Sequence, residues 1–175
     1  MSAQDKRPGM MATDAALDSA RHGSEKLAQA NINPATGLAT DYLNHFNEAV
    51  MLLEMLPDCP DCIDDFLAWQ PMSYREHFAA SRFKDRQVAI DAYDAADPAV
   101  RHCLNTLADT MSDVLQATRA TMRADLPASS AAHLAQRTAA SLKPLIARAG
   151  AIINGETAGE DANAPQAAVD LLMKR

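Results

Sequence analysis

The chain has no hydrophobic run of the length that crosses a lipid bilayer, which is about 20 apolar residues. Its most apolar stretch, residues 50–56, is interrupted by Glu54. Residues 1–18 carry acidic side chains and lack the apolar segment of a secretory signal peptide. These absences predict a cytoplasmic protein that does not bind membranes.

Cysteine and glycine are also scarce, with 3 Cys and 6 Gly among 175 residues. A small, odd number of cysteines argues against a disulfide scaffold. Few glycines together with abundant alanine favour helices, and no segment has the alternating pattern of a β-strand. The sequence therefore predicts an all-α fold, arranged as an up-and-down helical bundle.

Common catalytic and nucleic-acid-binding signatures are missing as well. There is no glycine-rich phosphate loop, no Gly-x-Ser-x-Gly and no His-Glu-x-x-His. The net charge is −7, and the basic stretch, residues 101–148, has no aromatic side chain on which a base could stack. We therefore expect a non-catalytic protein without a cofactor that does not bind nucleic acid.

Prolines mark the predicted helix starts. Asn33 before Pro34 and Asp97 before Pro98 each combine a capping side chain with a proline at the first helical position. Pro144 lies inside the last long helix and is expected to kink or divide it. The three long helices are predicted at residues 34–56, 98–124 and 130–153.

Individual residues modify the predicted starts of these helices and add a short one. Gly37 weakens the first turn of helix 34–56, so Thr40 is an alternative start, and Ser129 or Ser130 is the expected cap of helix 130–153. Ser73 and Glu76 have the spacing of a capping box, which predicts a short helix from residue 74. One apolar face of the first long helix repeats every three or four residues, at Tyr42, Phe46, Ala49, Leu53 and Leu56.

The predicted organisation has three parts. Residues 1–33 form an N-terminal segment that contains a weakly amphipathic helix from about residue 13 to 30. Residues 34–154 form a single helical-bundle domain with a helical insertion at 57–96. Residues 155–175 form a linker followed by a short helix, whose sequence PQAAVDLLMK is amphipathic.

All eight aromatic residues lie between residues 42 and 93. Residues 41–97 also carry 12 acidic and 4 basic side chains, whereas residues 101–148 carry 6 basic and 3 acidic ones. The aromatic residues could form a second small core, or they could wall a pocket or docking face. On the second interpretation the partner- or ligand-binding residues are Tyr42, Phe46, Trp69, Tyr74, His77 and Phe78.

A metal site is an alternative for the same region. Asp41, His45 and Glu48 share one helix face, but a polar face beside the apolar stripe explains them equally. A divalent metal such as zinc or iron would need further ligands from the insertion. The candidate ligands are His45, Glu48, Cys59, Cys62 and His77.

The string DCPDC, residues 58–62, allows three interpretations. Its Cys-x-x-Cys spacing supplies half of a zinc site, and a cysteine at a helix start can be redox-active. The third interpretation is structural: Pro60 begins a helix and Cys62 packs as a small apolar side chain. The surrounding acids disfavour a thiolate, which supports the structural interpretation.

The function predicted from these features is that of a non-catalytic cytosolic interaction protein, an adaptor or regulator. It would bind a partner protein through the acidic, aromatic-rich insertion. The alternative is a metal-binding or thiol-redox helical protein. Apolar residues beyond those that the predicted bundle needs, such as Met51 and Met55, suggest a homodimer. The C-terminal helix is expected to dock either on its own bundle or on a partner.

Overall fold

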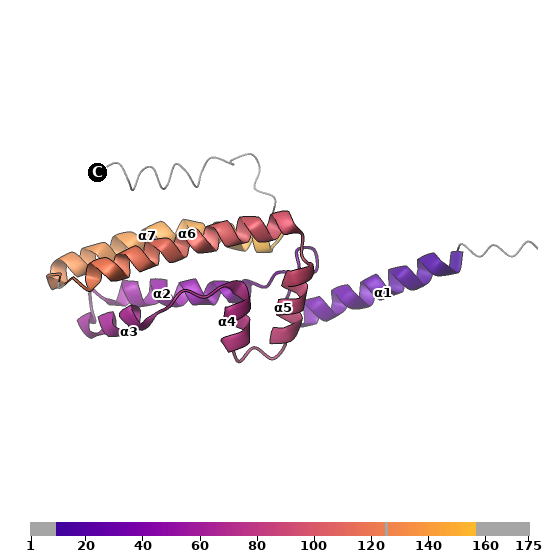
Figure 1. The fold of residues 1–175 in the computed structure, drawn as a ribbon, viewed down its shortest axis with the longest axis horizontal. Coiled ribbons are helices and arrows are strands. Elements are labelled where there is room, and N and C mark those ends of the chain that lie inside the picture. Colours follow the sequence, from indigo (N-terminus) through magenta and orange to yellow (C-terminus); the bar gives the residue numbers. More distant parts are fainter. Residues whose placement is uncertain (1–9, 125, 157–175) are drawn as a thin grey trace, which may run out of the picture.

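Every regular element in the described residues, 10–124 and 126–156, is helical in this computed structural model (Figure 1). These ranges contain no β-strand, so the predicted all-α class is confirmed. Within them, no helix has both the length and the apolar character that membrane crossing requires. The predicted C-terminal helix falls in residues 157–175, outside the described part of the chain.

Two long helices lie side by side and a third lies beneath them (Figure 1). The last helix, α7, packs against both α6 and α2, and α3, α4 and α5 lie below the two long helices in the view of Figure 1. The first helix, α1, projects from one end of this assembly. The elements are α1 (Met10–Gln29), η1 (Thr40–Leu43), α2 (Asn44–Met55), η2 (Pro60–Cys62), α3 (Ile63–Ala68), α4 (Tyr74–Ala80), α5 (Arg86–Ala95), α6 (Pro98–Met122) and α7 (Ala128–Ile153).

The predicted helix start at Pro34 is wrong, and the alternative start at Thr40 is confirmed. Residues 33–38 form a turn in which the Gly37 N–H donates to the Asn33 carbonyl at 2.8 Å. Gly37 has φ of +70°, and a Cβ there would lie 2.8 Å from the Ala92 carbonyl oxygen. Close approach to α5 therefore requires glycine here and prevents a helix. The predicted apolar face of η1 and α2 is buried as expected.

Helix α7 differs from the prediction at two points. Its N-cap is Pro127 rather than Ser129 or Ser130, because the extended Pro127 already places its carbonyl to accept the Ala131 N–H at 3.0 Å. Pro144 does not divide the helix. It lies on the exposed face, where the carbonyl left without a donor can be hydrated, so the helix continues to Ile153.

The α6–α7 interface is built largely from alanine and leucine. The buried residues include alanines on α7, among them Ala135 and Ala139, and larger side chains on α6 such as Leu104 and Met111. A hydrogen bond of 3.0 Å joins the hydroxyls of Thr118 and Thr138 across this interface. The short alanine side chains allow the two helix backbones to approach closely. A buried arginine on α6, Arg119, donates to the Leu67 carbonyl at 2.7 Å and so ties α3 to the long helices.

The predicted capping box of α4 is confirmed. The Glu76 N–H donates to the Ser73 hydroxyl, and the Ser73 N–H donates to Glu76 Oε2 at 2.8 Å. These bonds hold the Glu76 carboxylate in its charged form and lower its pKa. Because α4 has only seven residues, its start depends strongly on this cap.

Replacing Ser73 with alanine should lower the free energy of unfolding by about 1 kcal/mol, the usual cost of losing an N-cap. The matched control is Ser129→Ala, which removes the serine that was expected to cap α7 and does not. Chemical denaturation of both variants measures the difference. A loss for Ser129→Ala as large as that for Ser73→Ala would contradict the assigned cap positions.

Candidate functional site: an acidic hollow beside a buried aromatic cluster

Aromatic and imidazole rings from four segments meet on the side of α2 that faces the insertion. Tyr42 and Tyr74 lie 5.2 Å apart between ring centroids, and Tyr74 stacks on Tyr93 at 4.5 Å. His45 stacks on Trp69 at 4.6 Å with an interplanar angle of 21°. We call this set the aromatic cluster; its members are Tyr42, His45, Phe46, Trp69, Tyr74, His77, Phe78 and Tyr93.

Hydrogen bonds fix the polar atoms of the cluster. The Trp69 indole N–H donates to the His45 carbonyl at 3.1 Å, and the Tyr42 hydroxyl donates to the Met72 carbonyl at 3.0 Å. The Tyr74 hydroxyl accepts the Ala39 N–H at 2.9 Å. Burial raises the pKa of both Tyr42 and Tyr74, so the two phenols stay protonated at neutral pH.

The structure brings the six predicted binding residues together, but it buries five of them. Only His77 is partly exposed; Tyr42, Phe46, Trp69, Tyr74 and Phe78 are all buried. This burial matches the interpretation of the aromatic residues as core residues, although they share one core with the buried residues of α6 and α7 and do not form a separate second core. A partner that approaches this region would therefore meet the rim of the cluster rather than the ring faces.

One part of that rim is hollowed. A depression of about 430 Å³ lies between α2 on one side and α3 with the following segment, residues 69–72, on the other. We call it the acidic hollow, because Glu48 and Asp65 are its two carboxylates and both are exposed. Its lining residues are His45, Glu48, Leu52, Asp65, Ala68, Trp69, Gln70 and Met72.

His45 is the unusual side chain of the acidic hollow. It is only 3% exposed, and its Nε2 atom is buried without a hydrogen-bond partner among the described residues. Its pKa is lowered from 6.5 to about 4, chiefly by burial and also by the neighbouring His77, whereas a hydrogen bond to the backbone of Gln70 acts in the opposite direction. The hydrogen bond to Gln70 favours the charged ring, so a ring N–H must be its donor. In the neutral ring the other nitrogen carries this N–H, and Nε2 is therefore the acceptor. An unpaired buried acceptor is costly, and an N–H or O–H group from a ligand would satisfy it.

His77 lies behind His45, at 6.2 Å between ring centroids. Its Nε2 is 3.3 Å from the Asp41 carboxylate, and the two side chains form a half-buried pair between α4 and η1. The Asp41–His77 pair is separate from the residues that line the hollow. It therefore supports the position of α4 and does not form part of the accessible surface of the hollow.

The five candidate metal ligands are not gathered into one site. His45 and Glu48 line the acidic hollow, while Cys59 and Cys62 form a pair of their own. Throughout residues 10–124 and 126–156, no three His, Cys, Asp or Glu side chains are grouped so that they could hold a metal ion. The hollow thus has donor atoms of the right kind but not the number that a stable site requires.

The cysteine pair occupies a helix start, as the structural interpretation predicted. Cys59 is at the N-cap position of η2 and Pro60 is its first residue. The Cys62 thiol donates to Cys59 Sγ at 2.7 Å, and both thiols are free. That hydrogen bond, burial and the nearby carboxylates raise the pKa of Cys62 to about 11. Because a thiolate is the reactive form, these features favour a structural role over a thiol-redox role.

The sequence patterns indicated His45 and Glu48 only as metal ligands and Trp69 as a binding residue, and they did not indicate the other residues opposite α2. Asp65 comes from the first turn of α3, and Gln70 and Met72 come from the segment after α3. The excess of acids in residues 41–97 was the one signal that pointed toward Asp65. No local pattern marks Gln70 or Met72, because their place in the hollow depends on how α3 packs against α2.

Similarity to known proteins does not identify a function for this chain. No protein-family model matches it, and neither a curated protein nor a solved structure matches it significantly. The chemistry of the acidic hollow is therefore the basis on which a function can be proposed.

Proposed function

We propose that this chain is a non-catalytic helical interaction protein, an adaptor or regulator, that binds a basic segment of a partner protein in the acidic hollow. One observation carries the proposal. Buried His45, whose Nε2 acceptor is unpaired among the described residues, lines a depression that is also lined by the carboxylates of Glu48 and Asp65. Three acceptor groups around one depression favour a ligand that is rich in hydrogen-bond donors.

The charge of the hollow selects the class of partner. Carboxylates on both walls attract a cation, and the excess of acids in residues 41–97 adds a longer-range field of the same sign. An arginine side chain fits these features best, because its planar guanidinium offers five N–H donors and no acceptor. It can pair with a carboxylate and donate to His45 Nε2 at the same time.

The apolar part of the hollow suits the rest of such a side chain. Leu52, Met72 and the edge of Trp69 offer surface against which the methylene stem of arginine can pack. A volume of about 430 Å³ holds one or two side chains, not a whole domain. We therefore propose that the hollow is an anchor site within a larger contact, as is typical of interface hot spots.

The proposal includes the finer organisation predicted from the sequence. We propose that α2, α6 and α7 form an up-and-down bundle within a domain of residues 34–154, and that the insertion at 57–96 completes the hollow. A cytoplasmic location belongs to the same proposal. So does self-association through the exposed side chains of Met51 and Met55 on α2.

The experiment that tests this function is site-specific photo-crosslinking in the host cell. A photoreactive amino acid in place of Gln70, an exposed residue of the hollow, should capture a discrete partner through an arginine-containing segment. The same group in place of Gln136, an exposed residue of α7, is the control. Mass spectrometry of the crosslinked peptides identifies the captured segment.

Neutralising both carboxylates, with Glu48→Gln and Asp65→Asn together, should weaken this capture roughly tenfold or more, because charge pairs at interfaces contribute on the order of 1–2 kcal/mol or more. The matched control neutralises Asp113, an exposed acid on α6, with Asp113→Asn. The proposal is wrong if the crosslinked peptides are the same from both positions, or if they are not basic.

A further inference from the structure

We propose that the C-terminal segment of this chain, residues 165–174, docks in a groove between α5 and the end of α1. This groove, which we call the α5 groove, has a volume of about 490 Å³. Its walls include Lys26 and Leu27 of α1, Thr36 of the 33–38 turn, and Val88, Ala92 and Ala95 of α5. The inference concerns a different surface from the acidic hollow and does not depend on the proposed function.

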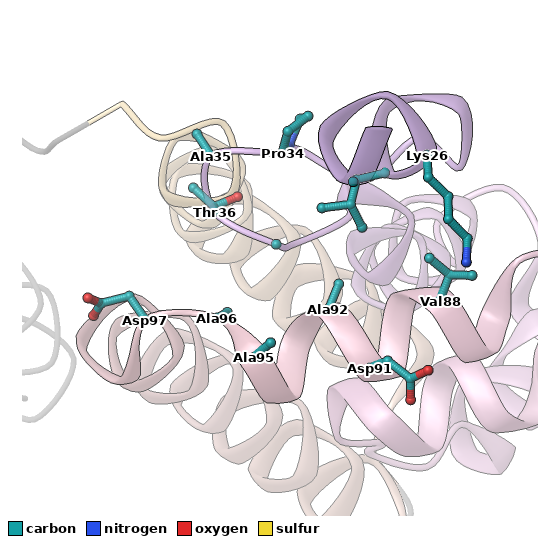
Figure 2. A pocket seen from close by; sticks show the side chains of 13 residues that line it. Lys26, Pro34, Ala35, Thr36, Val88, Asp91, Ala92, Ala95, Ala96 and Asp97 are labelled. Atoms are coloured by element: carbon teal, nitrogen blue, oxygen red, sulfur yellow. The ribbon is translucent and has the colours of Figure 1, made fainter. Parts of the chain in front are cut away.

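Figure 2 shows the shape of the α5 groove. Ala92 and Ala95 project from α5 toward the 33–38 turn, and Lys26 extends from α1 toward α5. The tight contact of Gly37 with Ala92 holds the turn and α5 together at the base. Because the alanine side chains are short, they leave open space above the base of the groove. This apolar base can accommodate larger apolar side chains.

The chain leaves the body of the protein at the edge of this groove. Helix α7 ends at Ile153, whose carbonyl accepts a hydrogen bond of 2.6 Å from the Thr36 hydroxyl. Gly155 also lies beside Thr36, since a Cβ at this position would be in ordinary contact with Thr36 Cγ2, at 3.5 Å. Residues 157–164 can span roughly 26 Å when extended, which is ample to bring residue 165 into the groove.

The C-terminal sequence complements the groove in both polarity and charge. Val169, Leu172 and Met173 have the spacing of one apolar helix face, which matches an apolar base. Asp170 can pair with Lys26, and the basic end of the chain can pair with the acids Asp91 and Asp97 along the α5 side of the groove.

Tethering favours the chain's own segment over a separate partner. A short covalent link gives the segment an effective concentration in the millimolar range, so even a weak contact is occupied. Leu27 and Val88 are only partly buried in the described structure, and an apolar occupant would cover them. The segment and the groove together would thus bury an apolar surface that each leaves accessible on its own.

Disulfide trapping in the full-length chain tests this inference. The background carries Cys59→Ser, Cys62→Ala and Cys103→Ser, and the test pair is Ala95→Cys with Leu172→Cys. Under a glutathione redox buffer this pair should form an intramolecular disulfide roughly ten times faster than a control pair, because proximity raises the effective concentration. The control is Gln116→Cys with Leu172→Cys, which places an exposed cysteine on α6 within reach of the segment.

Equal rates for the two pairs would overturn the inference. A crosslink between two chains whose rate rises with protein concentration would also overturn it, in favour of a second copy as the occupant. Hydrogen–deuterium exchange checks the result with the native cysteines in place. Leu172→Asp should speed the exchange of α5 amides, whereas Gln166→Asp should not, and an unchanged α5 in Leu172→Asp would reject the docking.

Discussion

Replacing Phe46 with alanine should lower the free energy of unfolding by about 3–5 kcal/mol. The Phe46 ring has no exposed surface, and it contacts the rings of Tyr42, His45 and Trp69 at centroid distances of 5.5, 5.4 and 6.4 Å. Its removal would leave a cavity where α2 meets the insertion, so the loss includes a cavity term besides the lost burial. Urea denaturation followed by the fluorescence of Trp69, the single tryptophan, measures it.

The matched control is Met51→Ala on the same helix. Met51 is 52% exposed, so its truncation should change stability by no more than about 0.5 kcal/mol at protein concentrations low enough to keep the chain monomeric. Together the two variants compare the buried and exposed faces of α2 with similar losses of side-chain volume. A loss below about 1 kcal/mol for Phe46→Ala would mean that the aromatic cluster is not tightly packed in solution.

This expected loss determines how the proposed function can be tested. Trp69 and Tyr74 are as deeply placed as Phe46, so alanine at either position would reduce binding by unfolding the site. Total stabilities of small domains are commonly about 5–15 kcal/mol, and such a loss removes a large part of that. The exposed carboxylates of Glu48 and Asp65 are therefore the informative positions for partner capture.

Features that depend on neighbouring residues were predictable from the sequence. The capping box of Ser73 and Glu76 and the Asp97-Pro98 start of α6 are confirmed because each is complete within four residues. The buried face of η1 and α2 follows from the spacing of its apolar residues alone. In each case the information that determines the local structure is also local.

A local prediction fails where contact with a distant part of the chain determines the local structure. Asn33-Pro34 has the pattern of a helix start, but the contact of Gly37 with Ala92, far along the chain, selects a turn. Propensity alone cannot rank such alternatives, because tertiary packing shifts the free energy by more than a cap contributes.

The same difference between local and long-range information applies to the candidate site. Clustering of the aromatic residues was predictable from their confinement to residues 42–93, but their burial was not, since aromatic side chains are common both in cores and at binding surfaces. The acidic hollow needs α2, α3 and the segment after α3 in their packed arrangement. The unpaired Nε2 of His45 is a property of that arrangement and has no counterpart in the sequence.

Acidification should destabilise the fold through His45. In the unfolded chain this imidazole has its ordinary pKa of 6.5, whereas in the folded protein burial lowers its pKa to about 4. Between these values the unfolded state binds a proton that the folded state does not. The free energy of unfolding should therefore be unaffected by His45 above pH 6.5 and should fall as the pH drops toward 4. The total loss is about 3 kcal/mol, at about 1.4 kcal/mol per pKa unit.

His45→Phe isolates this effect, because the variant keeps the other ionisable side chains near the ring, namely Glu48, Asp65 and the Asp41–His77 pair. Phenylalanine keeps a ring against Trp69 but binds no proton, so the wild-type stability minus the variant stability should fall by about 3 kcal/mol from pH 6.5 to 4. Any change in packing is independent of pH and shifts this difference without altering its slope. The control, His133→Gln on the exposed face of α7, should leave the slope unchanged. Equal losses of stability on acidification in His45→Phe and in the wild type would mean that the imidazole is hydrated. Nε2 would then not be the unpaired acceptor that the proposed partner needs.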